Sequence, residues 1–408
     1  MSIKRILLSQ AILCSSWLFI NAFGQPDADR TLILISFDGF RYDYISRYET
    51  PHIDALIEKG TTASALIPVF PTKTFPNHYS IATGLYPAHH GVLSNRMYDP
   101  KLEAWFRIGA GSIATTQEKW FGGEPIWITA EKQKVPTATC FWPGSDATFD
   151  GIRPTHHFKY NPSMSYDERI DQVLKWLQLE DRPRFISLYF ESPDREGHKY
   201  GPDAQQIKQA VEELDEKMGR LISNVQELNL TPLINWIIVS DHGMAKIQPD
   251  SLIFLDDYVS LSDIKIIERS PKADLIPVSG KEKLIYRQLS NAHPKLKVYK
   301  KGQTPATWKF NMHDRIAPIM AIAEEGWTIT TRRAYRFNPG GPSGGTHGYE
   351  VKYPSMHGIF IAHGPDIMQG KKIPAFENVD LYHLMCKLLR IKPAPNDGDK
   401  ATSALILN

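Results

Sequence analysis

Three short apolar segments, each followed closely by acidic or imidazole side chains, constrain this sequence more than any other feature. The segments are residues 32–37, 185–190 and 236–240. Near-continuous apolar runs of this length are typical of strands buried on both faces of a parallel sheet. In such sheets the carboxyl ends of the strands lie at one edge, where ligands bind. We therefore expect the polar side chains that follow the three segments to meet at one place.

Amphipathic stretches of helical length alternate with these segments. Val173, Leu174 and Leu177 recur at helical spacing within 166–179, and a second stretch of the same kind covers 203–228. A further helix is expected over 379–389, near the carboxyl end. Strands that alternate with helices predict an α/β fold with a doubly wound, mostly parallel sheet.

The pattern changes between about residue 251 and residue 342. Short strand-like pieces are predicted at 264–268, 275–278 and 297–300. A helix is predicted over 313–325, which Pro318 would shorten or kink. We interpret this region as a smaller α+β insertion that packs beside the main sheet of a single domain of residues 25–408.

The first 24 residues have the composition of a secretory signal. Lys4 and Arg5 supply the positive start, residues 6–20 are mostly apolar, and 22–24 form a small-x-small cleavage site. The apolar run is too short and too polar for a good membrane span. An uncleaved anchor is the alternative. We expect a secreted or periplasmic protein without a transmembrane segment after cleavage.

Composition also restricts the partners and crosslinks of the chain. The formal net charge is +2, so no overall attraction indicates a stable nucleic-acid partner or an anionic membrane. Any phosphate-bearing small molecule must meet positive charge that is local to its site. Cys140 and Cys386 leave two alternatives open, one disulfide or two buried free thiols. The sequence does not set the oligomeric state.

Six carboxylate and imidazole side chains are candidate metal ligands. They are Asp38, Asp194, His198, Asp241, His242 and His347. Three carboxylates and three imidazoles suit a pair of zinc ions with three protein ligands each, which leaves positions open for water and substrate. A single aspartate after a strand is more often a turn or cap residue. Several carboxylates crowded at one sheet edge would repel one another, and bound divalent cations resolve that conflict.

Thr74, within the segment 71–78, is the candidate nucleophile. Pro76 is well placed as the first residue of a helix, which makes Thr74 or Phe75 its N-cap. The same position has two interpretations. The hydroxyl either caps the helix, or it ionises because the helix dipole and an adjacent cation favour its alkoxide. The segment taken alone favours capping.

A wider set of motifs decides between these interpretations. The motifs are Ile35–Arg41, Pro71–Tyr79, Thr83–Pro87, Asp194–His198, Asp241–Met244 and Thr346–Tyr349. Together they resemble the nucleotide pyrophosphatase/phosphodiesterase family of the alkaline phosphatase superfamily. Segments 122–127, 141–146 and 391–396 fit the same family, so the resemblance covers nearly the whole mature chain and indicates a catalytic domain alone.

The resemblance implies roles for the individual site residues. One zinc ion would be surrounded by Asp38, Thr74, Asp241 and His242, and the other held by Asp194, His198 and His347. Asn95 falls where the family places an amide that holds a phosphoryl oxygen; its alternative role is a turn residue. Phe75 and Tyr189 are predicted to grip a base by stacking, the alternatives being a helix contact and a plain sheet residue.

The resemblance also implies the reaction. It is the zinc-dependent hydrolysis of nucleotide phosphodiester or pyrophosphate bonds through a covalent threonine intermediate, with release of nucleoside 5′-monophosphates. The segment 151–160 favours nucleotides, because the lysophospholipase D type lacks much of it. A choline-phospholipid phosphodiesterase is the alternative within the family. An inactive, metal-stabilised binding protein is the alternative from another class, whereas a sulfatase would need cysteine or serine in place of Thr74.

Overall fold

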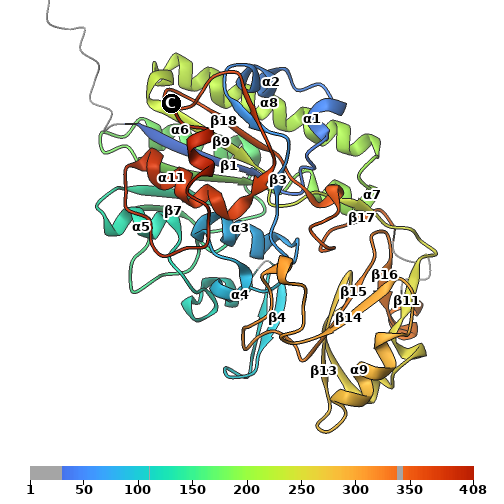
Figure 1. Ribbon diagram of the computed structural model, residues 1–408. Helices are drawn as coiled ribbons and strands as arrows, with labels where there is room; N and C mark the ends of the chain where they lie inside the picture. The colour runs from blue at the N-terminus through green and yellow to red at the C-terminus, as the bar shows by residue number, and fades with distance from the viewer. Residues whose placement is uncertain (1–29, 110, 338–342) are drawn as a thin grey trace, which may run out of the picture.

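The three predicted strands lie side by side at the centre of an eight-stranded sheet (Figure 1). The computed structural model describes residues 30–109, 111–337 and 343–408, so the predicted signal at 1–24 lies outside the described residues. The sheet order is β19-β2-β18-β9-β1-β8-β6-β7, and the five strands from β9 to β7 are parallel. The strands are β1 (Thr31–Phe37), β2 (Thr61–Ala63), β6 (Thr137–Cys140), β7 (His156–Phe158), β8 (Phe185–Phe190), β9 (Ile234–Val239), β18 (Phe360–His363) and β19 (Lys371–Ile373).

Helices cover both faces of this sheet (Figure 1). Because successive strand residues point to opposite faces, Leu32 and Leu34 of β1 pack into one core and Ile33 and Ile35 into the other. The first core contains α3 (Thr74–Thr83), α5 (Ile126–Lys132) and α11 (Leu381–Leu389), and the second contains α2 (Pro51–Glu58), α6 (Tyr166–Leu177) and α8 (Gln205–Glu227). The predicted doubly wound, mostly parallel α/β fold is confirmed.

Local signals explain where the long helices begin and what they bury. Ser165 and Glu168 form a reciprocal capping box that starts α6, which satisfies backbone donors that have no partner within the helix. Val211, Leu214 and Met218 of α8 are buried at helical spacing against the sheet. None of the helices among the described residues combines the length and the apolar character that crossing a membrane requires.

A smaller sheet stands apart from the main one (Figure 1), in the order β12-β13-β15-β14. Its elements are β12 (Ile264–Glu268), β13 (Lys272–Pro277), α9 (Glu282–Ser290), β14 (Leu296–Lys300) and β15 (Ile319–Ala323). The helix predicted over 313–325 is wrong, because residues 319–323 form β15. This strand pairs with β13 and β14 and is buried along its whole length. A continuous apolar run suits such a position, and Pro318 lies just before the strand, where it breaks no ladder.

Two close approaches bring distant loops to the carboxyl edge of the main sheet. The two-residue strands β10 (Ala245–Lys246) and β17 (Gly345–Thr346) pair antiparallel, which fixes the segment after β9 beside the segment before His347. Gly39 has φ +69, and a Cβ on it would lie 2.9 Å from the Cα of Asp194. Only glycine accepts both conditions at low cost. The backbone N–H of Asp194 donates to the carbonyl of Asp38 at 3.0 Å.

The two cysteines among the described residues, Cys140 and Cys386, are buried and free, in cores on opposite faces of the sheet. Burial raises the pKa of each thiol to about 12, which keeps them protonated and unreactive at neutral pH. We expect Ellman's reagent to label neither thiol in native protein from Gln25 onward and both after unfolding in guanidinium chloride. A reductant should leave the melting temperature unchanged, and a fall on reduction would contradict the fold described here.

Candidate active site

Three parallel strands deliver the predicted acidic ligands to one edge of the main sheet. Asp38 follows β1 directly, Asp241 lies two residues after β9, and Asp194 begins α7 (Asp194–Tyr200) shortly after β8. The register pairs Phe37 with Phe190 and brings the ends of β1 and β9 level. The structure therefore brings together the carboxylates whose meeting the sequence predicts.

The predicted histidines stand among these carboxylates. Nε2 of His242 lies 3.4 Å from Oδ1 of Asp38 and 3.1 Å from Oδ2 of Asp241. Nε2 of His347 lies 3.7 Å from Oδ1 of Asp194, and Nε2 of His198 lies 3.5 Å from Oδ2 of the same carboxylate. Two groups of ligand atoms lie within 4.8 Å of one another: Asp38 with Asp241 and His242, and Asp194 with His242 and His347.

Backbone carbonyls fix the orientation of all three imidazoles. Nδ1 of His198 donates to the carbonyl of Gly345, Nδ1 of His242 to that of Gly243, and Nδ1 of His347 to that of Thr72, at 3.0, 2.8 and 2.8 Å. These bonds place the proton on Nδ1 and leave the lone pair of Nε2 directed at the carboxylates. A second-shell bond of this kind is typical of histidines that ligate metals. Burial lowers the pKa of His242 and His347, which keeps both rings neutral.

The carboxylates show that the site is built for cations. Oδ1 of Asp38, Oδ1 of Asp194 and Oδ2 of Asp241 are buried and find no hydrogen-bond partner among the described residues. Burial, together with repulsion from neighbouring aspartates, raises the pKa of Asp38 and of Asp241 well above the ordinary value. Three carboxylate oxygens without donors and three imidazole lone pairs match the ligand preferences of divalent zinc. The residues present therefore fit a metal centre.

The hydroxyl of Thr74 faces this centre instead of capping its helix. Thr74 is the first residue of α3, the residue before it is Lys73, and no side chain caps the helix. The predicted start at Pro76 is thus two residues late. Oγ1 of Thr74 lies 3.3 Å from Nε2 of His242, and the residue is 8% exposed. The capping interpretation is excluded by these contacts, and the hydroxyl stands where α3 concentrates its positive dipole end.

A pocket of about 400 Å³, which we call the catalytic pocket, opens onto Thr74 and the metal ligands. Its lining includes Asp38, Thr74, Phe75, Asn95, Asp146, Tyr160, Tyr189, Glu191, Asp194, Arg195, His198 and His347. Oδ1 of Asn95 accepts from the backbone N–H of Phe75 at 2.9 Å, which leaves its Nδ2 hydrogens free to donate. The predicted Asn95 and Phe75 thus lie beside Thr74.

Tyr189 and Tyr160 occupy different positions in this pocket. Tyr189 is 8% exposed, and its hydroxyl donates to Oδ2 of Asp38 at 2.6 Å. Tyr160 is 36% exposed and offers more ring surface. The stacking predicted for Tyr189 stays a prediction, and Tyr160 is a candidate for it that the sequence pattern alone did not single out. Its position at the end of the segment 151–160 was the available signal.

His78 is a further residue that sequence reasoning left unassigned. It is fully buried behind Thr74, where Nδ1 donates to the carbonyl of Thr74 at 3.0 Å and Nε2 accepts from the hydroxyl of Ser36 at 2.8 Å. The indole N–H of Trp142 donates to the backbone carbonyl of His78 at 3.1 Å. These contacts hold the first turn of α3, and with it the hydroxyl of Thr74, against the sheet.

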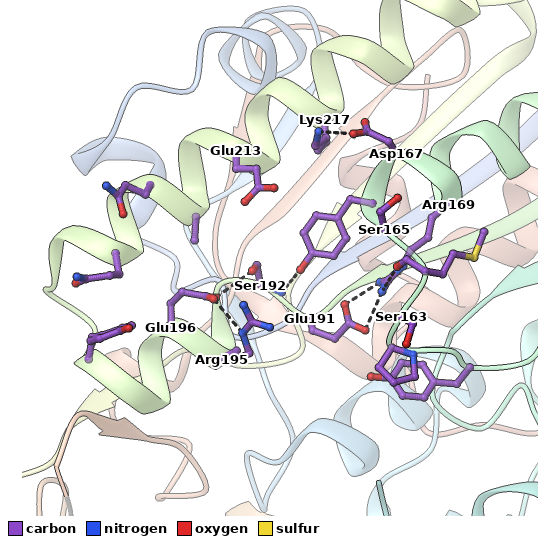
Figure 2. Close-up of a pocket in the computed structure, with 18 residues that line it drawn as sticks. Ser163, Ser165, Asp167, Arg169, Glu191, Ser192, Arg195, Glu196, Glu213 and Lys217 are labelled. Atoms are coloured by element: carbon purple, nitrogen blue, oxygen red, sulfur yellow. Dashed lines mark hydrogen bonds and ion pairs between the residues drawn. The ribbon is translucent and has the colours of Figure 1, made fainter. Parts of the chain in front are cut away.

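A second, wider pocket of about 680 Å³ lies beside the first and shares three lining residues with it (Figure 2). The shared residues are Tyr160, Glu191 and Arg195. A bidentate ion pair between Arg169 and Glu191, at 2.8 and 3.0 Å, stiffens the wall between the two pockets. None of the candidate metal ligands lines the second pocket, so the chemistry belongs to the smaller one.

Comparison with known proteins agrees with this site. The family described as type I phosphodiesterase / nucleotide pyrophosphatase matches residues 32–350. Human ectonucleotide pyrophosphatase/phosphodiesterase family member 5 is 36% identical over 395 residues, which are 97% of this chain and 81% of that protein. The bis(5'-adenosyl)-triphosphatase ENPP4 of Bos taurus is 39% identical over 372 residues, which are 90% of this chain and 80% of that protein.

Solved structures of the same family resemble this chain along most of its length. Human ectonucleotide pyrophosphatase / phosphodiesterase 5 has a TM-score of 0.88 and 35% identity, covering 92% of this chain and 100% of that chain. An inactive threonine-to-alanine variant of the murine protein, in complex with AMP, has a TM-score of 0.88 and 34% identity with the same coverage. By sequence, fold and site, this chain belongs to the type I phosphodiesterase / nucleotide pyrophosphatase family of hydrolases.

Proposed function

We propose that the chain hydrolyses nucleotide phosphodiester and pyrophosphate bonds, releasing nucleoside 5′-monophosphates, with Thr74 as nucleophile and two zinc ions as cofactors. The observation that carries this proposal is the position of the Thr74 hydroxyl, at the start of α3 and 3.3 Å from Nε2 of His242. Further support comes from the AMP bound to an inactive threonine variant of a related structure, and from a relative named as a bis(5'-adenosyl)-triphosphatase.

The ligand groups divide between two ions. Asp38, Asp241 and His242, with Thr74, would hold one zinc, and Asp194, His198 and His347 the other. His242 lies close to both groups of ligand atoms. When bound, zinc lowers the pKa of a coordinated hydroxyl and neutralises charge on phosphoryl oxygens.

The side chains of the site carry out the covalent step. The Thr74 hydroxyl loses its proton to water, and the dipole of α3 favours the resulting alkoxide. Oγ1 then forms a bond to phosphorus while the bond from phosphorus to the leaving oxygen breaks, which gives a phosphothreonine that still carries the nucleoside. The other part of the substrate leaves as a phosphate, or as an alcohol after its oxygen takes a proton from water. The Nδ2 hydrogens of Asn95 donate to a non-bridging oxygen as its charge grows. Water then cleaves the phosphothreonine, releasing the nucleotide and regenerating the hydroxyl.

The nucleotide base is proposed to lie between Phe75 and Tyr160. Both rings line the catalytic pocket, and Phe75 packs edge-on against Phe106 at 5.7 Å between centroids, which fixes its plane. The carboxylates of Asp146 and Glu191 line the same pocket and can accept from the amino or imide N–H groups of a base. The rings can stack on a base, and the substrate comparison below separates nucleotides from a choline headgroup.

We also propose that the chain works outside the cytoplasm. The secretory composition of residues 1–24 supports this, as does the word ectonucleotide in the names of several relatives.

Replacement of the nucleophile tests the covalent mechanism. We expect Thr74→Ala to lower kcat for p-nitrophenyl thymidine 5′-monophosphate by on the order of 10³-fold or more, because the attacking atom is removed. Thr74→Ser keeps that atom and should retain measurable turnover. Acid quench during turnover of ³²P-labelled thymidine ester should leave covalent label on the wild type. The serine variant is allowed to carry label as well, but Thr74→Ala should carry none.

The same assay compares substrates. We expect the thymidine ester to be preferred over p-nitrophenylphosphocholine. Preference for the choline ester would indicate a choline-phospholipid substrate that is cleaved by the same mechanism. Full activity in Thr74→Ala would refute the covalent step, and zinc binding without any turnover would favour the inactive binding protein.

Asp241 should lower the melting temperature of the protein without zinc and raise it when zinc is bound. In zinc-free buffer we expect Asp241→Asn to melt at a higher temperature than the wild type, because a buried, repelled carboxylate is neutralised. With zinc at about a thousandfold excess over its Kd, the wild type should gain about 4 kcal/mol and melt above the variant. Scanning calorimetry, with metal content by mass spectrometry, measures both.

Asp250→Asn is the matched control, since Asp250 is exposed on a loop. It should shift neither melting temperature. If zinc leaves the melting temperature of the wild type unchanged, the proposed metal centre is contradicted.

The proposed stacking of the base can be tested by comparing substitutions at Tyr160 and at Tyr189. Stacking contributes about 1–3 kcal/mol per base, so Tyr160→Leu and Phe75→Leu should each raise KM for the thymidine ester by about tenfold. KM for p-nitrophenylphosphocholine should stay unchanged, since that ester has no base. Tyr189→Phe removes only the hydrogen bond to Asp38 and should leave KM for the thymidine ester near wild type. A rise in KM confined to Tyr189→Leu would instead assign stacking to Tyr189.

A further inference from the structure

A two-stranded hairpin beside the catalytic pocket has one buried face and one basic face. It consists of β4 (Arg96–Asp99) and β5 (Ala104–Arg107). Met97 and Phe106 oppose each other on the buried face. Because side chains alternate along strands, the other face carries Arg96 opposite Arg107 and Tyr98 opposite Trp105. Figure 1 shows the hairpin between α4 (Pro87–His90) and the smaller sheet.

Four exposed cations gather on this face, and we call them the basic hairpin face: Arg96, Arg107, Lys265 and Arg269. The guanidinium carbons of Arg96 and Arg107 lie 5.0 and 5.1 Å from the centroid of the Trp105 ring. Nζ of Lys265, from β12 of the smaller sheet, lies 3.8 Å from the Tyr98 centroid and 4.9 Å from that of Trp105. The aromatic rings hold the positive groups in place.

The four cations have no anion of their own. Within residues 30–109, 111–337 and 343–408 none of them forms an ion pair, whereas Arg315 and Arg332 each bind an aspartate. Glu268 is a carboxylate whose charge acts on Arg96, but it accepts from the hydroxyl of Ser94 at 2.5 Å and lies 3.8 Å from Nζ of Lys272.

This arrangement opposes the stability of the hairpin. Arg96 and Arg107 are like charges directly across a strand pair, which is unfavourable. Partial burial, with repulsion from Arg107 and Arg269, lowers the pKa of Arg96. A group of cations held together without a counter-charge is matched when an external anion binds.

The basic hairpin face is continuous with the reaction site. Asn95, which lines the catalytic pocket, directly precedes Arg96, and Ile108, which lines it too, directly follows Arg107. On the other side, the carbonyl of Ser270, next to Arg269, accepts from Nζ of Lys73 at 3.5 Å, and Lys73 precedes Thr74. A long substrate seated at Thr74 can therefore extend beyond the pocket towards these cations.

We propose that the basic hairpin face binds a run of phosphate groups that continues beyond the scissile phosphate. The ligand class is a linear chain of phosphates, carried either by a polyphosphate chain or by a phosphodiester backbone. The proposal rests on the proposed function for the identity of the scissile group. It assigns to the face the role of selecting substrates whose leaving part carries several negative charges.

Direct binding tests this proposal without turnover. The probes are fluorescein-labelled octathymidylate with phosphorothioate linkages, which keeps its charges and resists hydrolysis, and inorganic tripolyphosphate as competitor. We expect the double variant Arg107→Gln/Lys265→Gln to bind octathymidylate at least tenfold more weakly at 50 mM salt, measured by anisotropy. The slope of log Kd against log salt should become shallower by about 1.4, that is about 0.7 for each lost cation on a single strand.

Arg287→Gln is the matched control, because this arginine is exposed on α9 and its loss changes the net charge in the same direction. It should bind like the wild type. Both variants should keep wild-type turnover of p-nitrophenyl thymidine 5′-monophosphate, whose leaving group has no phosphate. The proposal is overturned if neither probe binds the wild type, or if the double variant binds both probes as the wild type does.

The remaining outcomes distinguish a polyphosphate ligand from a phosphodiester ligand. They also distinguish failure of this proposal from failure of the proposed function. Binding of tripolyphosphate alone assigns the face to polyphosphate chains, and tight binding of octathymidylate alone assigns it to phosphodiester backbones. Loss of binding in the double variant, with no turnover of any ester by the wild type, would refute the proposed function and leave the basic hairpin face as an anion site.

Discussion

Three aspartate carboxylates meet at the carboxyl edge of a parallel sheet, two of them buried and that of Asp194 partly buried, and placing them together costs free energy. Each has one oxygen that no donor among the described residues satisfies, and bringing an ion out of water costs several kcal/mol even after relaxation. The fold cannot move these groups apart, because β1, β8 and β9 are neighbouring parallel strands and end at the same level. Bound cations would offset this cost, and this is the physical reason for proposing a metal centre at this edge of the sheet.

The surroundings of the carboxylates are arranged for the same purpose. Each histidine directs Nε2 at them because its Nδ1–H is bonded to a backbone carbonyl. The histidine most distant in sequence, His347, is held in place by the short pairing of β10 with β17. That pairing needs Gly345, where a Cβ would lie 2.7 Å from the carbonyl oxygen of Gly197. The glycines near the site thus serve close packing of ligand loops as well as flexibility.

The sequence predicted the parts of this molecule that depend on local pattern. The strands β1, β8 and β9 were predictable because both faces of each are covered, which requires a continuous apolar run. The same reasoning failed at residues 319–323, since a buried strand of five apolar residues and a buried helical turn look alike in sequence. The meeting of Asp38, Asp194 and Asp241 was predictable because each lies at or shortly after a strand end, whereas the roles of these residues as metal ligands stay predictions. The burial of Tyr189 against Asp38, and the greater exposure of Tyr160, depend on how distant segments pack.

Electrostatic function in this chain is local, which its net charge of +2 conceals. Carboxylates gather at the candidate metal ligands, and four cations without an ion pair among the described residues gather on the basic hairpin face. The candidate metal ligands, Arg96 and Arg107 lie outside the smaller sheet. Lys265 and Arg269 come from β12 of that sheet and from the residue that follows β12. No sequence pattern links Lys265 to Trp105, because their contact joins two regions that fold on separate sheets. The reaction therefore depends on the main sheet, whereas the choice of leaving group depends on how the smaller sheet is set against the hairpin.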